Sequence, residues 1–146
     1  MRNESPHSGT LCIGVVAGGS DPYKLVNEIG QALTSFPDEF KVFLFTLTSE
    51  KKIQDPRFHY VEIGLQMEEL MREVDLIFST SSTTSLELIA CGYCVAVVCA
   101  VDNQRQYYQA IAKMGLAEQI GFRNVENTWE LDLGKMRALI TSSELS

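Results

Sequence analysis

LCIGVVAGGSDP, residues 11–22, is the stretch from which the fold class follows most directly. Its first seven residues form a continuous apolar run, as is typical of a parallel strand that is buried on both faces. Two glycines follow, and then Asp21 and Pro22, residue types that favour the cap and the first position of a helix. Apolar residues then recur at helical spacing up to residue 35. The stretch therefore predicts a buried strand, a glycine turn and a helix.

The alternation of strand and helix continues along the chain. Further strands are expected at residues 42–47, 59–63, 76–78 and 95–101, and further helices at residues 67–74, 86–90, 108–115 and 129–140. This order predicts an α/β fold, namely a Rossmann-like, three-layer domain with a mostly parallel sheet of five or six strands. Residues 11–146 are expected to form that domain, and the polar residues 1–10 a flexible arm or the remnant of a linker.

The composition is that of one soluble globular domain. With 146 residues the chain can bury a sizeable core, and no apolar run reaches the roughly 20 residues that span a bilayer. Its start is polar and does not have the pattern of a secretion signal, so a cytoplasmic location is expected. The 12 basic and 19 acidic residues are interspersed and give a net charge of −7, which argues against a nucleic acid as the main partner.

The four cysteines are Cys12, Cys91, Cys94 and Cys99. Cys91 and Cys94 form a C-x-x-C pair, which is compatible with a redox centre or with half of a zinc site. No second pair and no histidine at ligand spacing accompanies them, so we favour reduced thiols without a metal over a thiol or metal protein. Cys12 and Cys99 stand inside apolar runs and are expected to be small core residues.

Polar segments follow the expected strands, and right-handed crossovers place all of them at one edge of the sheet. These segments are residues 18–21, 46–49, 64–66, 79–85 and 102–104. Ligands of such sheets bind at this edge, outside the carboxyl ends of the strands. We therefore expect a small-molecule site to lie there.

Gly18, Gly19 and Ser20 begin the first of these segments. The glycines would let backbone amides approach a ligand closely, and the helix start behind them favours negative charge. A tight turn capped by Asp21 explains the segment equally well. The chain has neither the G-x-G-x-x-G pattern of dinucleotide sites nor the Walker pattern, which weakens the dinucleotide and ATPase hypotheses.

Seven consecutive hydroxyl residues, Ser79–Ser85, precede the helix expected at residues 86–90. One hydroxyl would cap that helix, while the others, with the free amides of the helix start, are suited to an anion. Glu87, expected in the first turn, either complements the helix dipole or accepts hydrogen bonds from the cis-diol of a ribose. Asn103 and Gln104, after the fifth strand, either begin a solvated helix or bind sugar hydroxyls.

Catalytic groups are not evident. The chain lacks a G-x-S-x-G elbow, an H-E-x-x-H motif and a credible Ser/His/Asp set. His59 begins a short strand, away from the edge where a ligand is expected, so it is not assigned as a base. The sequence thus predicts binding groups and leaves the catalytic residues unassigned.

Four spaced motifs resemble the C-terminal half of a known family. They are G-G-S-D-P at residues 18–22, M-x-x-L-M-x-x-x-D-L-I at 67–77, T-x-x-E-L-x-A-x-G at 84–92 and D-N-Q at 102–104. The family is the UDP-sugar hydrolase of pseudaminic acid synthesis with its spore-coat polysaccharide relatives, which belong with the GT-B glycosyltransferases. The likeness covers roughly residues 11–121.

The resemblance implies the UDP-sugar-binding domain of a glycosyltransferase or UDP-sugar hydrolase in surface polysaccharide or nonulosonic acid synthesis. The catalytic group would come from an N-terminal GT-B domain in the same or another chain. No cofactor and no metal are expected, and the ligand would be UDP or a UDP-sugar. Its diphosphate would be held by Ser82, Thr83 and Thr84, and its ribose by Glu87. The cleft near the phosphates would be lined by Gly18 and Gly19, and Ser20 would belong to the same binding site. The sugar would face Asn103 and Gln104, and the base would be read by the backbone of Gly64, Leu65 and Gln66.

The sequence also departs from the family's pattern. Ser81 and Ser82 stand where the family usually has glycines, which alters the approach of a phosphate, and Cys94 stands where it has proline. The N-terminal domain is missing from these residues, so a fragment, an excised domain or a degenerate stand-alone half is expected. The alternative function is therefore a non-catalytic GT-B half that acts as an assembly or regulatory module.

Overall fold

The computed structural model describes residues 10–16, 25–46, 53–62, 69–80, 83–99, 109–110, 113, 118–123 and 128–145. Within them the strands are β1 (Leu11–Val16), β2 (Phe40–Thr46), β3 (Phe58–Glu62), β4 (Leu76–Thr80), β5 (Val95–Cys99), β6 (Glu118–Arg123) and β7 (Trp129–Leu131). The longer helices are α1 (Leu25–Thr34), α3 (Thr83–Ala90) and α5 (Leu133–Leu145). None of the helices described is long and apolar enough to cross a membrane.

The strands form one sheet in the order β3-β2-β1-β4-β5-β6-β7. Neighbours from β3 to β6 are parallel, and β7 pairs antiparallel with β6. This confirms the predicted Rossmann-like class with a mostly parallel sheet. The described residues hold seven strands, however, rather than the five or six expected.

The two additional strands, β6 and β7, lie where the hydrophobic pattern is weakest. β6 reads EQIGFR, and the three-residue β7 contains Trp129, which was expected to open the last helix. The prediction rested on the helical spacing of Trp129 with Met136 and Ile140. It was wrong, since Trp129 lies in β7 and the helix begins only at Leu133. Met136 and Ile140 are buried as expected, whereas Leu133 is 46% exposed.

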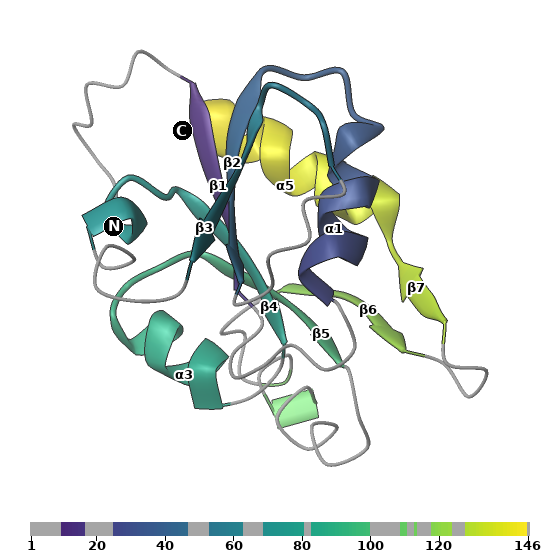
Figure 1. Cartoon of the computed structure of the whole chain (residues 1–146). Coiled ribbons are helices and arrows are strands. Elements are labelled where there is room, and N and C mark those ends of the chain that lie inside the picture. Colours follow the sequence, from purple (N-terminus) through teal and green to yellow (C-terminus); the bar gives the residue numbers. More distant parts are fainter. Residues whose placement is uncertain are drawn as a thin grey trace.

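Helices cover both faces of the sheet, with α1 and α5 on one face and α3 on the other (Figure 1). The strand period of two divides β1 accordingly. Ile13 and Val15 pack in the core with α1 and α5, while Cys12 and Val16 pack in a second core that also contacts α3. Both faces of the central strands are therefore buried, which explains their continuous apolar runs.

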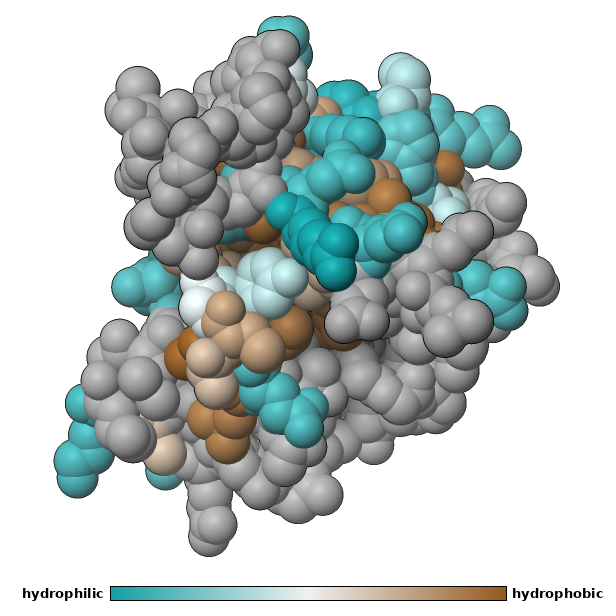
Figure 2. Space-filling model, turned by 90° about the vertical axis from the view of Figure 1, so that its left-hand side faces the viewer, coloured by the Kyte–Doolittle hydropathy of each residue, from teal (hydrophilic) through white to brown (hydrophobic). Residues whose placement is uncertain are grey.

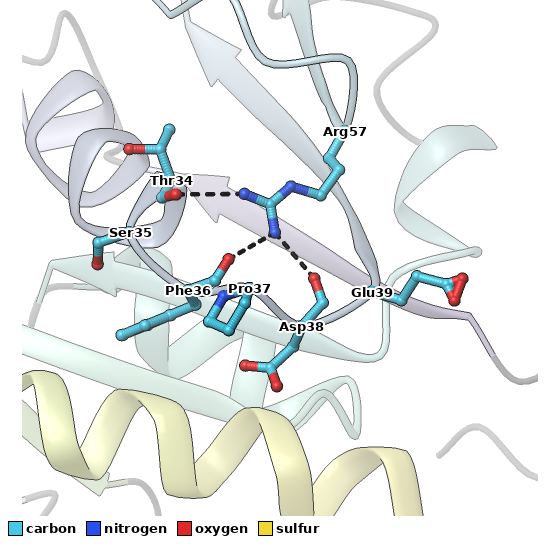
Figure 3. A pocket seen from close by; sticks show the side chains of 7 residues that line it. All are labelled: Thr34, Ser35, Phe36, Pro37, Asp38, Glu39 and Arg57. Atoms are coloured by element: carbon cyan, nitrogen blue, oxygen red, sulfur yellow. Dashed lines mark hydrogen bonds between the residues drawn. The ribbon is translucent and has the colours of Figure 1, made fainter.

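Arg57, which no sequence motif singles out, binds the carbonyls around the end of α1. Its guanidinium donates hydrogen bonds to the backbone carbonyls of Thr34 at 3.3 Å, and of Phe36 and Asp38 at 2.8 Å (Figure 3). It also forms a two-pronged ion pair with Asp55, with N–O distances of 3.1 and 2.8 Å. Carbonyls at and beyond a helix end need such partners, so Arg57 fixes the turn from α1 into β2.

The Asp55–Arg57 pair makes stability depend on pH. Side-chain hydrogen bonds from Arg57 hold the pKa of Asp55 below its ordinary value, against the opposing effect of burial. A carboxyl whose pKa is lowered by folding stabilises the protein above the unfolded pKa of about 3.9, and that stability is lost as the pH falls through the folded pKa. We expect the urea midpoint of the wild type to fall more steeply below about pH 4 than that of Asp55→Asn. Equal pH dependence in the two proteins would contradict this role.

Candidate ligand site at the carboxyl edge of the sheet

The strand order reverses between β1 and β4, because β2 and β3 continue the sheet on one side and β5 to β7 on the other. In open α/β sheets this switch point opens a crevice outside the carboxyl ends of the strands, where ligands bind. Val16 at the end of β1 is in register with Ser79, the penultimate residue of β4. The two strand ends therefore reach the same level at this edge of the sheet.

Buried polar side chains gather at this edge. Among the described residues the buried polar side chains are Thr46, Ser79, Thr80 and Ser85. Thr46 ends β2, Ser79 and Thr80 end β4, and Ser85 lies in the first turn of α3. Burying a hydroxyl costs free energy unless it is hydrogen-bonded, so this concentration of polar groups marks the edge as different from the rest of the core.

The predicted anion-binding residues Thr83 and Thr84 are the first two residues of α3. The helix therefore begins three residues earlier than expected, three residues after the end of β4, and the amides of its first turn have no partner within the helix. Glu87, expected in the first turn, is the fifth residue of α3 and is exposed. The dipole of a helix acts mainly within its first turn, so this position weakens the dipole explanation for Glu87 and favours the ligand hypothesis.

The surface around Glu87 is apolar. Figure 2 looks onto the side where α3 lies, and hydrophobic surface gathers there in the lower part of the view. Leu86, Leu88 and Ile89 are only partly buried, and Ala90 is exposed. Glu87 is the one charged residue of α3. A carboxylate on an otherwise apolar helix is a stronger candidate for a specific contact than one on a generally charged face.

The other predicted contacts lie outside the described residues. They are Gly18, Gly19, Ser20, Ser82, Asn103 and Gln104, and the backbone of Gly64, Leu65 and Gln66. The strands that precede them, β1, β4, β5 and β3, all end at the same edge. Their assignment to the ligand therefore stays a prediction.

Asp75, an element of the D-L-I motif, has a structural role that the sequence analysis did not identify. Its carboxylate accepts a hydrogen bond from the backbone N–H of Cys12 at 2.9 Å, and its own N–H donates to the Cys12 carbonyl at 2.7 Å. Asp75 thus joins the amino ends of β1 and β4, the two strands that flank the switch point. An acidic residue directly before a buried strand was the available signal.

The C-x-x-C pair lies away from this edge, in the turn that leads from α3 into β5. Both Cys91 and Cys94 are free and exposed. Gly92, with φ at 94°, ends α3: its N–H bonds to the Ile89 carbonyl and that of Tyr93 to the Leu88 carbonyl, the pattern of a Schellman cap.

Burial confirms that Cys12 and Cys99 are core residues. The described part of the chain has no group of three or more His, Cys, Asp or Glu residues that could hold a metal. His59 lies on β3 and is exposed.

A shallow pocket opens at the opposite, amino edge of the sheet and is lined by residues 34–39 and Arg57 (Figure 3). Its one cationic group, Arg57, is already engaged by three carbonyls and the Asp55 carboxylate. This pocket is therefore part of the α1–β2 connection and offers no free donor set to a ligand.

Solved structures with a similar fold include two glycosyltransferases. No family model matches the sequence, and no curated protein matches it. In structure, the glycotransferase of kitacinnamycin matches 98% of this chain and 37% of its own, with a TM-score of 0.66 and 12% identity. The glycosyltransferase SnogD from Streptomyces nogalater matches 79% of this chain and 32% of its own, with a TM-score of 0.53 and 15% identity.

The chain thus spans about a third of the length of these two glycosyltransferases. At this identity the likeness establishes the fold alone: the chain is a Rossmann-like α/β domain of the kind found in GT-B glycosyltransferases. The likeness does not extend to the UDP-sugar hydrolase family in particular.

Proposed function

We propose that this chain is the donor-binding, C-terminal half of a GT-B protein and binds a nucleotide-diphosphate sugar, specifically a UDP-sugar. The observation that carries the proposal is the convergence, at the switch point, of the buried hydroxyl residues with the start of α3. Hydroxyl groups and free amides at a helix start suit the negative charge of a diphosphate. The likeness to glycosyltransferase structures agrees with this assignment.

Glu87 extends the proposed site along α3. It follows Thr83 by four residues, which corresponds to about 6 Å along a helix axis. A nucleotide diphosphate bound at Thr83 and Thr84 would therefore have room to bring its ribose to Glu87, whose carboxylate can accept hydrogen bonds from both ribose hydroxyls. The segments after β3 and β5 would then contact the base and the sugar.

The reaction that such a domain would serve is glycosyl transfer or UDP-sugar hydrolysis, in surface polysaccharide or nonulosonic acid synthesis. In this proposal the chain contributes donor binding, and the catalytic group comes from a second domain. A specific observation favours one other function, since the apolar outer surface of α3 would also suit a protein partner in a non-catalytic assembly module. A partner whose binding is indifferent to UDP and is lost when α3 is altered would favour that alternative.

Calorimetric titration with UDP tests the proposal. We expect a dissociation constant of about 10 µM to 1 mM for the chain alone, equivalent to roughly −7 to −4 kcal/mol. Glu87→Ala should weaken UDP binding about tenfold or more, because the ribose hydroxyls lose a charged acceptor. Glu39→Ala is the matched control, since Glu39 is also an exposed glutamate but precedes β2 at the opposite edge of the sheet.

The control should bind UDP like the wild type. Absence of heat at millimolar UDP from folded protein would contradict nucleotide binding. Unchanged affinity in Glu87→Ala would contradict the role of Glu87 while leaving the rest of the site in place.

A further inference from the structure

The hydroxyl of Ser79 is buried without a partner. Ser79 has no exposed surface, and its Oγ is the one buried side-chain oxygen or nitrogen among the described residues that lacks a hydrogen-bond partner. It is the penultimate residue of β4, flanked in register by Val16 of β1 and Val97 of β5. Ser79 therefore lies at the switch point of the sheet.

The side chain of Ser79 points to the face covered by α3. Its register partners Val16 and Val97, and Ile77 two residues earlier on the same strand, all belong to the core cluster that packs against α3. Because side chains alternate between the faces of a strand, Ser79 shares that side. α3 begins three residues after β4 ends, so the unpartnered hydroxyl lies beneath the helix start.

An unpartnered, buried hydroxyl in this position lowers the stability of the ligand-free protein. An unsatisfied buried hydroxyl keeps its full desolvation cost, whereas an alanine at the same place would remove the polar atom and leave a void smaller than a methyl group. Ser85, equally buried in the first turn of α3, carries no such unpartnered hydroxyl. Among these two serines, the unsatisfied group is thus specific to the end of β4.

We propose that Ser79 is a ligand-binding residue whose hydroxyl donates a hydrogen bond to an anionic oxygen held at the start of α3. This inference rests on the proposed function and deepens it, because it assigns Ser79 to the diphosphate of the nucleotide. It combines two independent observations, the amino terminus of an eight-residue helix and the buried, unpartnered hydroxyl on the face of the sheet that this helix covers. The loss of stability in the free protein is then offset when the ligand binds.

The variant Ser79→Ala separates ligand binding from a structural role, because the two predict opposite changes in stability. We expect Ser79→Ala to raise the melting temperature of the free protein by roughly 2–5 °C, since it removes an unsatisfied polar atom. The same variant should weaken the binding of UDP and of inorganic pyrophosphate about tenfold, and leave uridine unaffected. Ser85→Ala, the control, should lower the melting temperature because its hydroxyl is not unpartnered.

Three outcomes would overturn the inference. A lower melting temperature in Ser79→Ala would show that the hydroxyl has a structural partner, and unchanged affinity for both anions would show that it does not meet the ligand. Absence of pyrophosphate and UDP binding by the wild type would contradict both the inference and the proposed function. If the wild type binds pyrophosphate but not UDP, the nucleotide proposal fails, and a tenfold loss for pyrophosphate in Ser79→Ala still supports the anion-binding role.

Discussion

Replacing Arg57 with alanine is expected to lower the free energy of unfolding by about 3–4 kcal/mol. The change removes the donor shared by three backbone carbonyls around the end of α1 and leaves the Asp55 carboxylate without its charged partner, with only the backbone N–H of residue 57 still donating to it. It also removes the guanidinium that lies 4.3 Å from the centre of the Phe40 ring. Urea unfolding followed by circular dichroism at neutral pH measures the loss.

Arg137→Ala is the matched control for this prediction. Arg137 also pairs with Asp38, at 3.1 Å, but its side chain is 51% exposed and donates to no backbone carbonyl of that turn among the contacts described. Exposed ion pairs contribute little, so we expect a loss below about 1 kcal/mol. Equal losses in the two variants would contradict the account of Arg57 as the closure of α1. Arg57→Lys should not restore stability, because an ammonium cannot reproduce the two-pronged geometry.

Gly121→Ala is expected to destabilise the protein by about 3 kcal/mol or more. Gly121 has φ at 157°, and a Cβ there would collide with the backbone oxygen of Glu130 and approach the Leu131 Cα to 3.0 Å. Both contacts are with backbone, so neither can relax by a side-chain rotation. The expected consequence is the detachment of β7 from β6, with loss of the packing of Trp129 and Leu131 against the core.

Trp129 is the only tryptophan of the chain, so its fluorescence reports directly on β7. Emission shifted to longer wavelength in Gly121→Ala, together with a lower melting temperature, would match the prediction. Gly134→Ala is the control, since a Cβ at this helical position meets only the Asp132 carboxylate oxygen at 3.6 Å. It should be neutral or gain up to about 1 kcal/mol from helix propensity. A Gly121→Ala protein as stable as the wild type would refute the steric argument.

The central part of the fold was predictable because its strands are buried on both faces. Apolar runs bounded by turn residues mark β1, β2, β4 and β5 in the sequence, and α1 appears as an amphipathic helix between β1 and β2. β6 and β7 were not predictable in the same way. The register of β6 shifts between Val97 and Val98 of β5, which interrupts its alternation, and β7 is too short to show a period. Pairing with β6 overrides the helical spacing of Trp129.

The edge that holds the candidate site was also predictable, but the roles of individual residues there were not. In the sequence the seven hydroxyl residues 79–85 look equivalent. The structure divides them, since Ser79 and Thr80 end β4 while Thr83–Ser85 begin α3. The unpartnered state of Ser79 depends on β1 and β5, which lie far away in the chain. Arg57 could not be identified for the same reason, because its partners at the end of α1 are 19 to 23 residues distant.

The proposed ligand, a nucleotide diphosphate, binds at the switch point between β1 and β4. The most direct test is a titration of the isotopically labelled chain with UDP, followed through its backbone amide resonances by NMR. We predict that the largest shifts fall on the amides of Thr83, Thr84 and Ser85 and on the end of β4, with saturation by about millimolar UDP. Shifts confined to another region, such as the Cys91–Cys94 turn or the β6–β7 edge, or no shifts at millimolar UDP, would contradict the claim.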